Sequence, residues 1–221
     1  MQTQKMENKP METPETLYRG VVLPASEVHS GLLTQDLAPG SGKIDDQGRK
    51  VVHDGNEYGV YMTDNPSMVK SAYGSPPDYG DDLPDSPSFK WRGVPGIKVQ
   101  APRVGITYQI DTNGLDVRKP FILDVWQSHY NNGFKGDEWI SDSVPATNHE
   151  ITRLKIGRDI LHDPKVIEVS DDPEIAFEEL RMEIDRRLGR LAVACDIIES
   201  LPASSRLNDF RIKEVLANIP G

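Results

Sequence analysis

Short apolar runs fill the first three quarters of the chain, and one long helical pattern follows them. Gly, Pro, Asn and Asp bound the runs, which is typical of short strands joined by turns. The predicted strands are 16–23, 58–63, 97–99, 104–110, 121–126, 138–141 and 165–169. From residue 173 onward apolar side chains recur every three or four positions, and this spacing predicts a helix of about 25 residues. Its apolar stripe consists of Leu180, Ile184, Leu188, Leu191, Cys195 and Ile198.

Capping signals bound the predicted helices. Asp172-Pro173-Glu174 starts the long helix with a cap, a proline in the first turn and an acid that suits the helix dipole, and Pro202 ends it. Asp64 or Asn65 can cap a shorter helix over residues 66–73. The other expected elements are a short helix or turn at 24–29, a short helix at 209–217, and long loops at 38–57 and 74–96.

These elements predict the fold class and the domain organisation. The strands do not alternate regularly with helices, which argues against a parallel, doubly wound sheet. We expect an α+β fold with two small, mostly antiparallel sheets and a C-terminal helical extension. Residues 1–14 predict a disordered tail, 15–170 the main domain and 171–221 the extension. The apolar stripe of the long helix either packs onto its own domain or forms a surface for a partner or a second copy.

Composition narrows the function classes. The 221 residues carry 25 Lys and Arg against 35 Asp and Glu, a net charge of −10. This balance disfavours non-specific binding to nucleic acid or to anionic membranes, although a small basic site remains compatible with it. No apolar run is long enough to span a membrane, and no secretory signal is visible. The protein is therefore expected in the cytoplasm, or delivered into a target cell by a route without a classical signal peptide.

Several common chemical motifs are absent. The single cysteine excludes an intramolecular disulfide and a cysteine-based metal site, and the five histidines lack metal-ligand spacing, so no metal is expected. The segment Gly40-Ser41-Gly42-Lys43 lacks the other positions of a phosphate-binding loop. Neither a dinucleotide-binding glycine fingerprint nor a hydrolase nucleophile elbow occurs.

Three segments together resemble one superfamily. The first is Leu17-Tyr18-Arg19-Gly20, the second is Gly59-Val60-Tyr61-Met62-Thr63-Asp64 with Lys70-Ser71-Ala72-Tyr73 behind it, and the third is Asp137-Glu138-Trp139-Ile140. In this order they resemble the ADP-ribosyltransferase superfamily, which includes poly-ADP-ribose polymerase-like domains and bacterial toxins. There the first strand carries His-Gly or Arg-Gly, the second reads Gly-Ile-Tyr-Phe-Ala-Asp, and the third carries the catalytic Glu. The resemblance implies that residues 15–170 are the catalytic domain and that the two sheets surround an NAD cleft.

The resemblance makes Glu138 the catalytic residue. The nicotinamide ring already carries a positive charge while it is part of NAD, so no acid is needed to protonate it before it leaves. A single carboxylate can stabilise the oxocarbenium-like ribose and orient its 2′-hydroxyl. Tyr61 and Tyr73 would hold the nicotinamide ring between two aromatic faces, and Gly20 and Ser71 would bind its carboxamide.

Two further residues complete the implied NAD site. Arg19 would bind the diphosphate or ribose oxygens of NAD, and Thr63 would supply a small hydroxyl on the second strand. Each assignment has a structural alternative. These alternatives are a solvated strand carboxylate for Glu138, ordinary aromatic packing for Tyr61 and Tyr73, a helix-surface serine for Ser71, and a salt bridge for Arg19.

The acceptor stays open between protein, nucleic acid, a small molecule and water, with protein favoured over nucleic acid. Gly136 stands where arginine-modifying toxins have Glu and some DNA-modifying members have Gln, so neither acceptor is supported. Phe134, in the turn before the third segment, would contact the acceptor; a plain hairpin turn is the alternative. An inhibitor or antitoxin partner is a further option.

The sequence therefore predicts an NAD-dependent ADP-ribosyltransferase of toxin or phage-effector type that transfers ADP-ribose to a macromolecular acceptor. Two alternatives remain. The first is an NAD glycohydrolase acting at the same site. The second is a catalytically silent interaction module that keeps the fold and docks partners through the helix at 173–200.

Overall fold

The computed structural model describes residues 12–40, 43–51, 57–70, 102–120, 137–159, 161–200 and 218. The strands are β1 (Thr16–Pro24), β2 (Lys43–Ile44), β3 (Lys50–Val51), β4 (Val60–Thr63), β5 (Arg103–Asp111), β6 (Glu138–Ser141), β7 (His149–Ile156) and β8 (Lys165–Glu168). The helices are α1 (Pro66–Met68), α3 (Pro173–Ser200) and the 3-10 turns η1 (Ala25–Glu27), η2 (Ser30–Thr34) and η4 (Ala146–Asn148).

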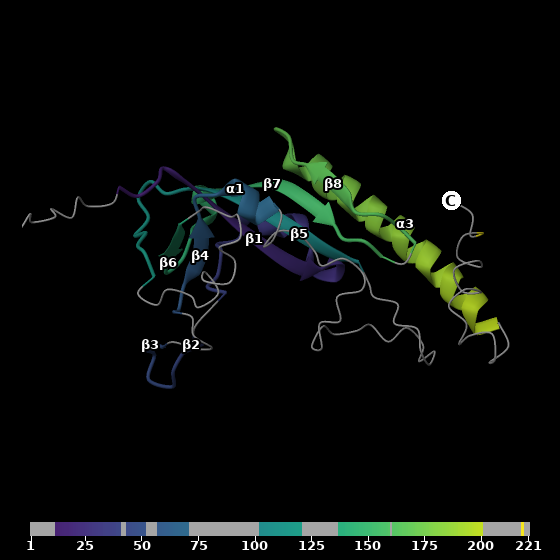
Figure 1. Ribbon diagram of the computed structural model, residues 1–221, viewed down its shortest axis with the longest axis horizontal. Coiled ribbons are helices and arrows are strands. Elements are labelled where there is room, and N and C mark those ends of the chain that lie inside the picture. The colour runs from purple at the N-terminus through teal and green to yellow at the C-terminus, as the bar shows by residue number, and fades with distance from the viewer. Residues whose placement is uncertain are drawn as a thin grey trace, which may run out of the picture.

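Six strands form one antiparallel sheet in the order β6-β4-β1-β5-β7-β8. The hairpin of β2 and β3 is separate and projects from the body (Figure 1). The prediction of an α+β fold with antiparallel pairing and one long C-terminal helix is confirmed. The predicted pair of small sheets is instead one six-stranded sheet and a hairpin.

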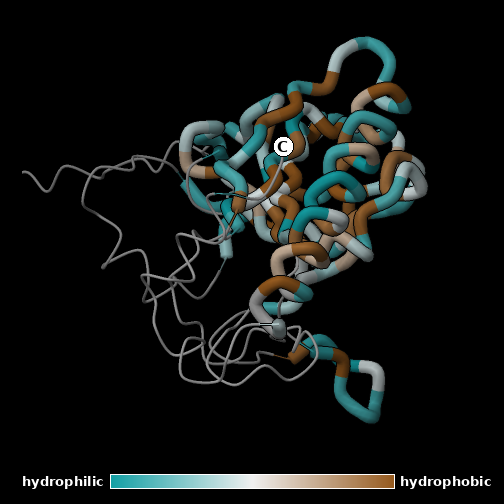
Figure 2. Tube along the Cα trace, turned by 90° about the vertical axis from the view of Figure 1, so that its right-hand side faces the viewer, coloured by the Kyte–Doolittle hydropathy of each residue, from teal (hydrophilic) through white to brown (hydrophobic). Residues whose placement is uncertain are grey.

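One face of the sheet forms the core. Alternate residues of each strand point to this face, and α3 lies across it (Figure 1). The core residues that the strands and α3 share are Leu17, Val60, Met62, Val104, Ile106, Tyr108, Ile110, Trp139, Ile151, Leu154, Ile156, Ile167, Ala176, Phe177, Leu180 and Ile184. Figure 2 shows hydrophobic stretches gathered where the strands and α3 lie together. This burial, and not the local propensity of short strands, holds the sheet together.

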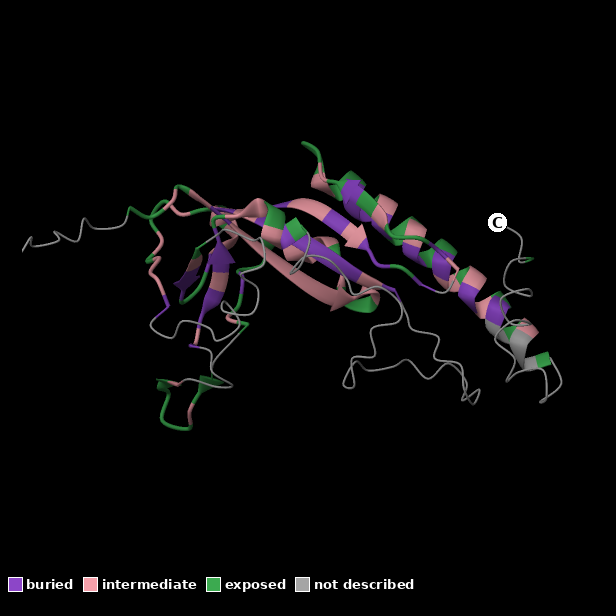
Figure 3. Cartoon of the chain, viewed as in Figure 1, coloured by how far each residue is buried: buried purple, intermediate pink, exposed green. Residues whose placement is uncertain are grey.

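Helix α3 packs onto its own domain. The Asp172 carboxylate accepts a hydrogen bond from the Glu174 N–H at 3.1 Å, which confirms the expected cap. Leu180, Ile184 and Leu191 are buried, and exposed residues fill the opposite side of the helix (Figure 3). The stripe therefore serves packing in its described part; the side chains of Cys195 and Ile198 lie outside the described residues. Within the described ranges, no helix is both long enough and apolar enough to cross a membrane.

The sequence patterns missed β7. Its inward residues are Ile151, Leu154 and Ile156, a spacing of three and then two. The register with β5 shifts between Thr107 and Tyr108, so β7 carries one extra residue at that point. A β-bulge of this kind breaks the strict alternation by which strands are recognised. The predicted strands at 97–99 and 121–126, the helix at 209–217 and residues 71–73 of the shorter helix lie outside the described residues.

Candidate functional site

Strands β1 and β4 meet at a single position and then separate. All nine residues of β1 pair with β5, but β4 pairs with β1 only where Tyr18 lies opposite Thr63. Beyond this junction β1 continues along β5, whereas β4 and β6 turn away from it (Figure 1). Among the strands that the structure describes, none therefore borders this edge of β1 from residue 19 onward.

The backbone of Gly20 faces this uncovered edge. The Ala25 N–H donates to the Pro102 carbonyl at 3.1 Å, and the Thr112 N–H donates to the Glu15 carbonyl at 3.1 Å. Peptide groups alternate between the two edges of a strand, so the odd-numbered residues of β1 bond to β5. The N–H and C=O of Gly20 consequently point to the side that β4 leaves. Such an edge can bind an amide group of a ligand as a strand would.

Three predicted site residues share one face beside this edge. Tyr18 pairs with Thr63, and Thr63 pairs with Glu138 across β4 and β6, so these side chains leave the sheet on the same side. Tyr61 lies two residues before Thr63 and points to that side as well. Directly opposed residues lie about 4.5–5.5 Å apart between Cβ atoms. The structure thus brings Tyr61, Thr63 and Glu138 together next to Gly20.

Neighbouring contacts hold Glu138 at the start of β6. The Asp137 N–H donates to the Asp64 carboxylate at 2.8 Å, which ties the residue before Glu138 to the end of β4. Lys119 pairs with Asp137 at 2.9 Å, and its ammonium lies 3.8 Å from the ring centre of Trp139. Both sequence neighbours of Glu138 are therefore anchored, and its carboxylate is half-buried and makes contacts of its own.

Arg19 lies on the opposite face from Glu138. It pairs with Tyr108 across β1 and β5, one residue beyond the junction. Its Nη1 is buried and finds no hydrogen-bond partner, and among the described residues it forms no ion pair. A Cβ on Gly40 would come within 2.8 Å of Arg19 Nη2, so the loop after η2 closes over the guanidinium. The structural salt bridge considered for Arg19 is thus not found within the described part of the chain.

Burial governs the titration of this pair. Desolvation lowers the pKa of Arg19, while the adjacent Tyr108 acts to raise it. Burial raises the pKa of the Tyr108 phenol to about 12, against the opposing effect of the Arg19 charge. Arg19 and Glu138 start on different faces of the sheet, close to the place where β1 and β4 separate.

The remaining predicted site residues, Ser71, Tyr73 and Phe134, lie outside the described residues. The helix start that precedes the first two is present. The Asn65 side chain accepts a hydrogen bond from the Ser67 N–H at 2.9 Å, and Pro66 opens α1. Of the two residues expected to cap this helix, Asp64 and Asn65, Asn65 is therefore the cap.

The structure adds an ion pair beside Tyr61 that the sequence patterns did not single out. Glu57 is buried and binds Arg118 at 2.7 Å between Oε2 and Nη1. The only signal in the sequence for this pair was an acid directly before the predicted strand at 58–63. Its partner could not be predicted, because Arg118 lies far along the chain. These two residues join the predicted site because they contact the strands that hold Tyr61 and Glu138.

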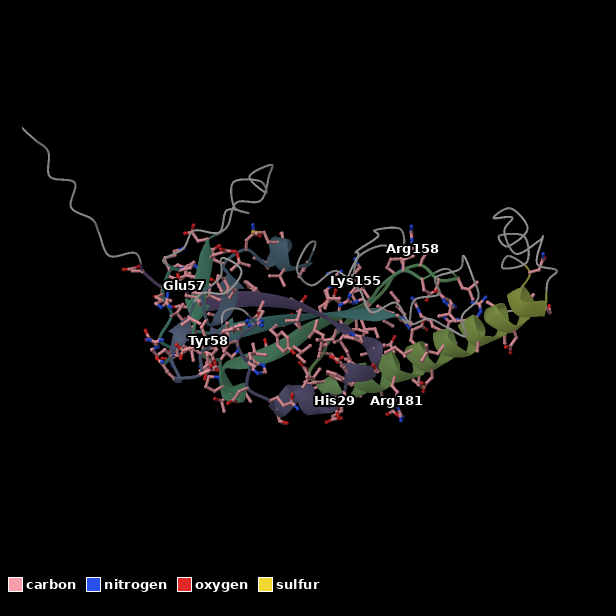
Figure 4. The ribbon with its side chains drawn as sticks, turned by 90° about the horizontal axis from the view of Figure 1, so that it is seen from below. His29, Glu57, Tyr58, Lys155, Arg158 and Arg181 are labelled. Atoms are coloured by element: carbon pink, nitrogen blue, oxygen red, sulfur yellow. The ribbon has the colours of Figure 1, made fainter. Side chains whose placement is uncertain are left out.

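A second buried group of charges lies in the loop between β7 and β8, where α3 packs against it. His162 Nδ1 donates to Asp159 at 2.8 Å, and Arg187 of α3 approaches Asp159 at 3.5 Å. Burial lowers the pKa of His162, although its bond to Asp159 acts in the opposite direction. The loop that contains this group also carries the exposed Arg158 (Figure 4). The group attaches α3 to the sheet.

Within the described ranges, no set of three or more His, Cys, Asp or Glu side chains is arranged to hold a metal ion. Comparisons of the chain with protein-family models, with curated proteins and with solved structures found no match.

Proposed function

We propose that the protein is an ADP-ribosyltransferase that cleaves the bond between nicotinamide and ribose in NAD and transfers ADP-ribose to a macromolecular acceptor. The observation that carries the proposal is the junction of β1 and β4. No described strand covers the Gly20 backbone there, and the junction sets Tyr61, Thr63 and Glu138 on one face beside it.

The junction suits the nicotinamide end of NAD. A carboxamide has one acceptor and two donors, and the Gly20 N–H and C=O offer the matching pair. The absence of a side chain at Gly20 lets a planar ring approach the backbone closely. The Tyr61 ring, on the neighbouring strand, provides an aromatic face for the cationic pyridinium.

Glu138 suits the bond-breaking step. The bond between the ribose C1′ and the nicotinamide nitrogen breaks with its electron pair on nitrogen, which becomes neutral. Positive charge develops on the ribose, and a fixed carboxylate stabilises it. The nucleophilic atom of the acceptor then bonds to C1′ and releases its proton to solvent. Anchoring of Asp137 and Trp139 keeps the Glu138 carboxylate in place during this step.

Arg19 suits the diphosphate. Arg19 is half-buried, and its Nη1 is buried without a hydrogen-bond partner. A desolvated cationic group without an anionic partner is costly to a fold, and such a cost is retained where a ligand supplies the anion. NAD that crosses the gap between β1 and β4 presents its nicotinamide to one face and its diphosphate towards the other. This arrangement supports one extended ligand contacting both Glu138 and Arg19 in spite of their opposite faces.

The test compares the wild-type protein with Glu138→Gln, using biotin-labelled NAD in a lysate and chromatography of released nicotinamide. Because Glu138 stabilises the transition state, the substitution should lower nicotinamide release about 10²–10³-fold. Glu150→Gln is the matched control, since Glu150 lies on β7, three strands from β4, pairs with Gln109 on the same face and is exposed. Its rate should equal that of the wild type.

The same experiment identifies the acceptor. Loss of the label after protease treatment indicates a protein, and loss after nuclease treatment indicates a nucleic acid. Nicotinamide release without macromolecular label indicates water as the acceptor and the glycohydrolase alternative. The proposal is overturned if the wild type releases no nicotinamide and neither NAD nor nicotinamide raises its melting temperature, a result that favours the interaction module.

A further inference from the structure

The phenol of Tyr61 is held from the chain segment that enters β4. The Glu57 backbone N–H donates to the Tyr61 hydroxyl oxygen at 2.9 Å. A tyrosine on a strand ordinarily chooses between rotamers, and a hydrogen bond at the far end of the ring selects one of them. The direction of the Tyr61 ring therefore depends on where residue 57 lies.

Residue 57 is itself fixed by an ion pair between its buried carboxylate and the half-exposed side chain of Arg118. The Glu57 side chain is 9% exposed, and its Oε2 lies 2.7 Å from Nη1 of Arg118. Glu57 lies in the part of the molecule that holds β4 and β6 (Figure 4). A pair like this contributes little net stability, because desolvation of the Glu57 carboxylate offsets its attraction to Arg118. Its distinctive effect is to define position.

Arg118 is anchored on the far side of β6. The Arg118 N–H donates to the Ile140 carbonyl at 3.0 Å, and the Ile140 N–H donates to the Arg118 carbonyl at 2.8 Å. Ile140 in turn pairs with Tyr61. Arg118, Ile140 and Tyr61 thus form one row across three neighbouring segments, on the face that also carries Glu138. Diagonal neighbours in a sheet lie about 7–8 Å apart, which describes Arg118 and Glu138.

Gly59 allows the chain to reach this position. A Cβ at residue 59 would lie 2.5 Å from Ile140 Cγ1 and 2.9 Å from the Ser141 carbonyl oxygen. Only a glycine lets the segment between Glu57 and β4 run so close to β6. This close approach allows the backbone N–H of residue 57 to reach the hydroxyl of the Tyr61 ring.

We propose that Glu57 and Arg118 are positioning residues that hold the Tyr61 ring at the angle required to stack on the nicotinamide of NAD. The inference rests on the proposed function, because it assigns the ring its ligand. The ion pair acts through the Glu57 backbone and does not touch the ligand. The Gly20 edge binds the carboxamide, and the fixed Tyr61 ring limits the rotation of the base around it.

The test uses the full chain with Glu57→Gln and Arg118→Lys. Glu57→Gln removes the charge at nearly constant shape, and Arg118→Lys keeps the charge but loses the planar fork. A less constrained Tyr61 should raise KM for NAD about 3- to 10-fold in Glu57→Gln, the range that loss of one aromatic contact supports, with kcat within about 2-fold. Arg118→Lys should recover part of the loss. Lys50→Met is the matched control, because it breaks the exposed ion pair with Asp142 near β6.

A second measurement needs no NAD. With 3-fluorotyrosine placed at position 61, the fluorine NMR signal should be narrow in the wild type and shifted or broadened in Glu57→Gln, at temperatures where both proteins remain folded. An unchanged signal together with an unchanged KM overturns the inference and leaves the proposed function standing. Failure of the wild type to bind or cleave NAD overturns the proposed function and the ligand assigned to Tyr61. The fluorine signal then still decides whether Glu57 orients the ring.

Discussion

Arg187 carries the attachment of α3 to the sheet. Its side chain is 2% exposed, and its Nε donates to Glu183 at 2.8 Å. Its other nitrogens donate to the Gly157 carbonyl at 2.9 Å and the Asp163 carbonyl at 2.7 Å, and Asp159 lies at 3.5 Å. A single guanidinium thus binds the Glu183 carboxylate of its own helix and, in the loop between β7 and β8, the Asp159 carboxylate and two carbonyls.

Arg187→Met removes these bonds while keeping much of the volume. The buried Asp159 carboxylate would lose its guanidinium partner, whereas Glu183 would keep Arg186. Breaking a buried ion pair from one side costs about 3–5 kcal/mol. For a domain of this size each kcal/mol lowers the melting temperature by about 2–4 °C, so the expected drop is about 6–20 °C. Urea unfolding followed by circular dichroism at 222 nm measures the change in the free energy of unfolding.

Arg186→Met is the matched control. Arg186 binds the same acid, Glu183, at 2.7 Å, but its side chain is 48% exposed. Exposed pairs contribute about 0–1 kcal/mol, so this variant should unfold close to the wild type. A free energy of unfolding for Arg187→Met within about 1 kcal/mol of that for Arg186→Met would refute the reasoning from burial.

Three further outcomes follow from single sites. Arg19→Met should raise the melting temperature while weakening NAD binding, because it removes a buried cation without a partner; a lower melting temperature would contradict this. Burial lowers the pKa of folded His162, so the unfolded chain binds more protons below about pH 6.5. The free energy of unfolding therefore decreases as the pH is lowered. His162→Gln should flatten urea midpoints measured between pH 7 and 5.5, and an unaltered slope would exclude His162 as the cause. Gly59→Ala, whose Cβ would meet Ile140, should cost about 1–3 kcal/mol, whereas Gly189→Ala on open helix surface should add about 0.5–1 kcal/mol; equal melting temperatures would refute the contrast.

Much of the secondary structure could be predicted from local patterns. The strand expected at 138–141 has those bounds in the structure, and the long helix begins at Pro173 beside its predicted cap. These elements depend on alternation, capping and proline placement, which act over a few residues. β7 escaped prediction because its bulge changes the spacing between Ile151 and Leu154. A bulge depends on the partner strand and leaves no clear local signal.

The candidate site was only partly predictable. The sequence pointed to Tyr61, Thr63 and Glu138, and the pairing of β4 with β6 brings them to one face. It also pointed to Arg19 as a cation within an apolar strand, but gave no indication that its side chain starts on the opposite face. Glu57 escaped notice because its partner is far along the chain.

The sequence by itself determined most of the sheet strands, the start of the long helix and which residue types were available for chemistry, but it did not reveal β7 or the hairpin of β2 and β3. The tertiary structure alone decided which strands are neighbours, that β1 and β4 meet only at Tyr18 and Thr63, and on which face each side chain lies. The physical reason is the range of the interactions. Turns, caps and alternation follow from backbone geometry within a few residues, whereas strand order follows from burying one face of the sheet in a core that all its strands share with α3.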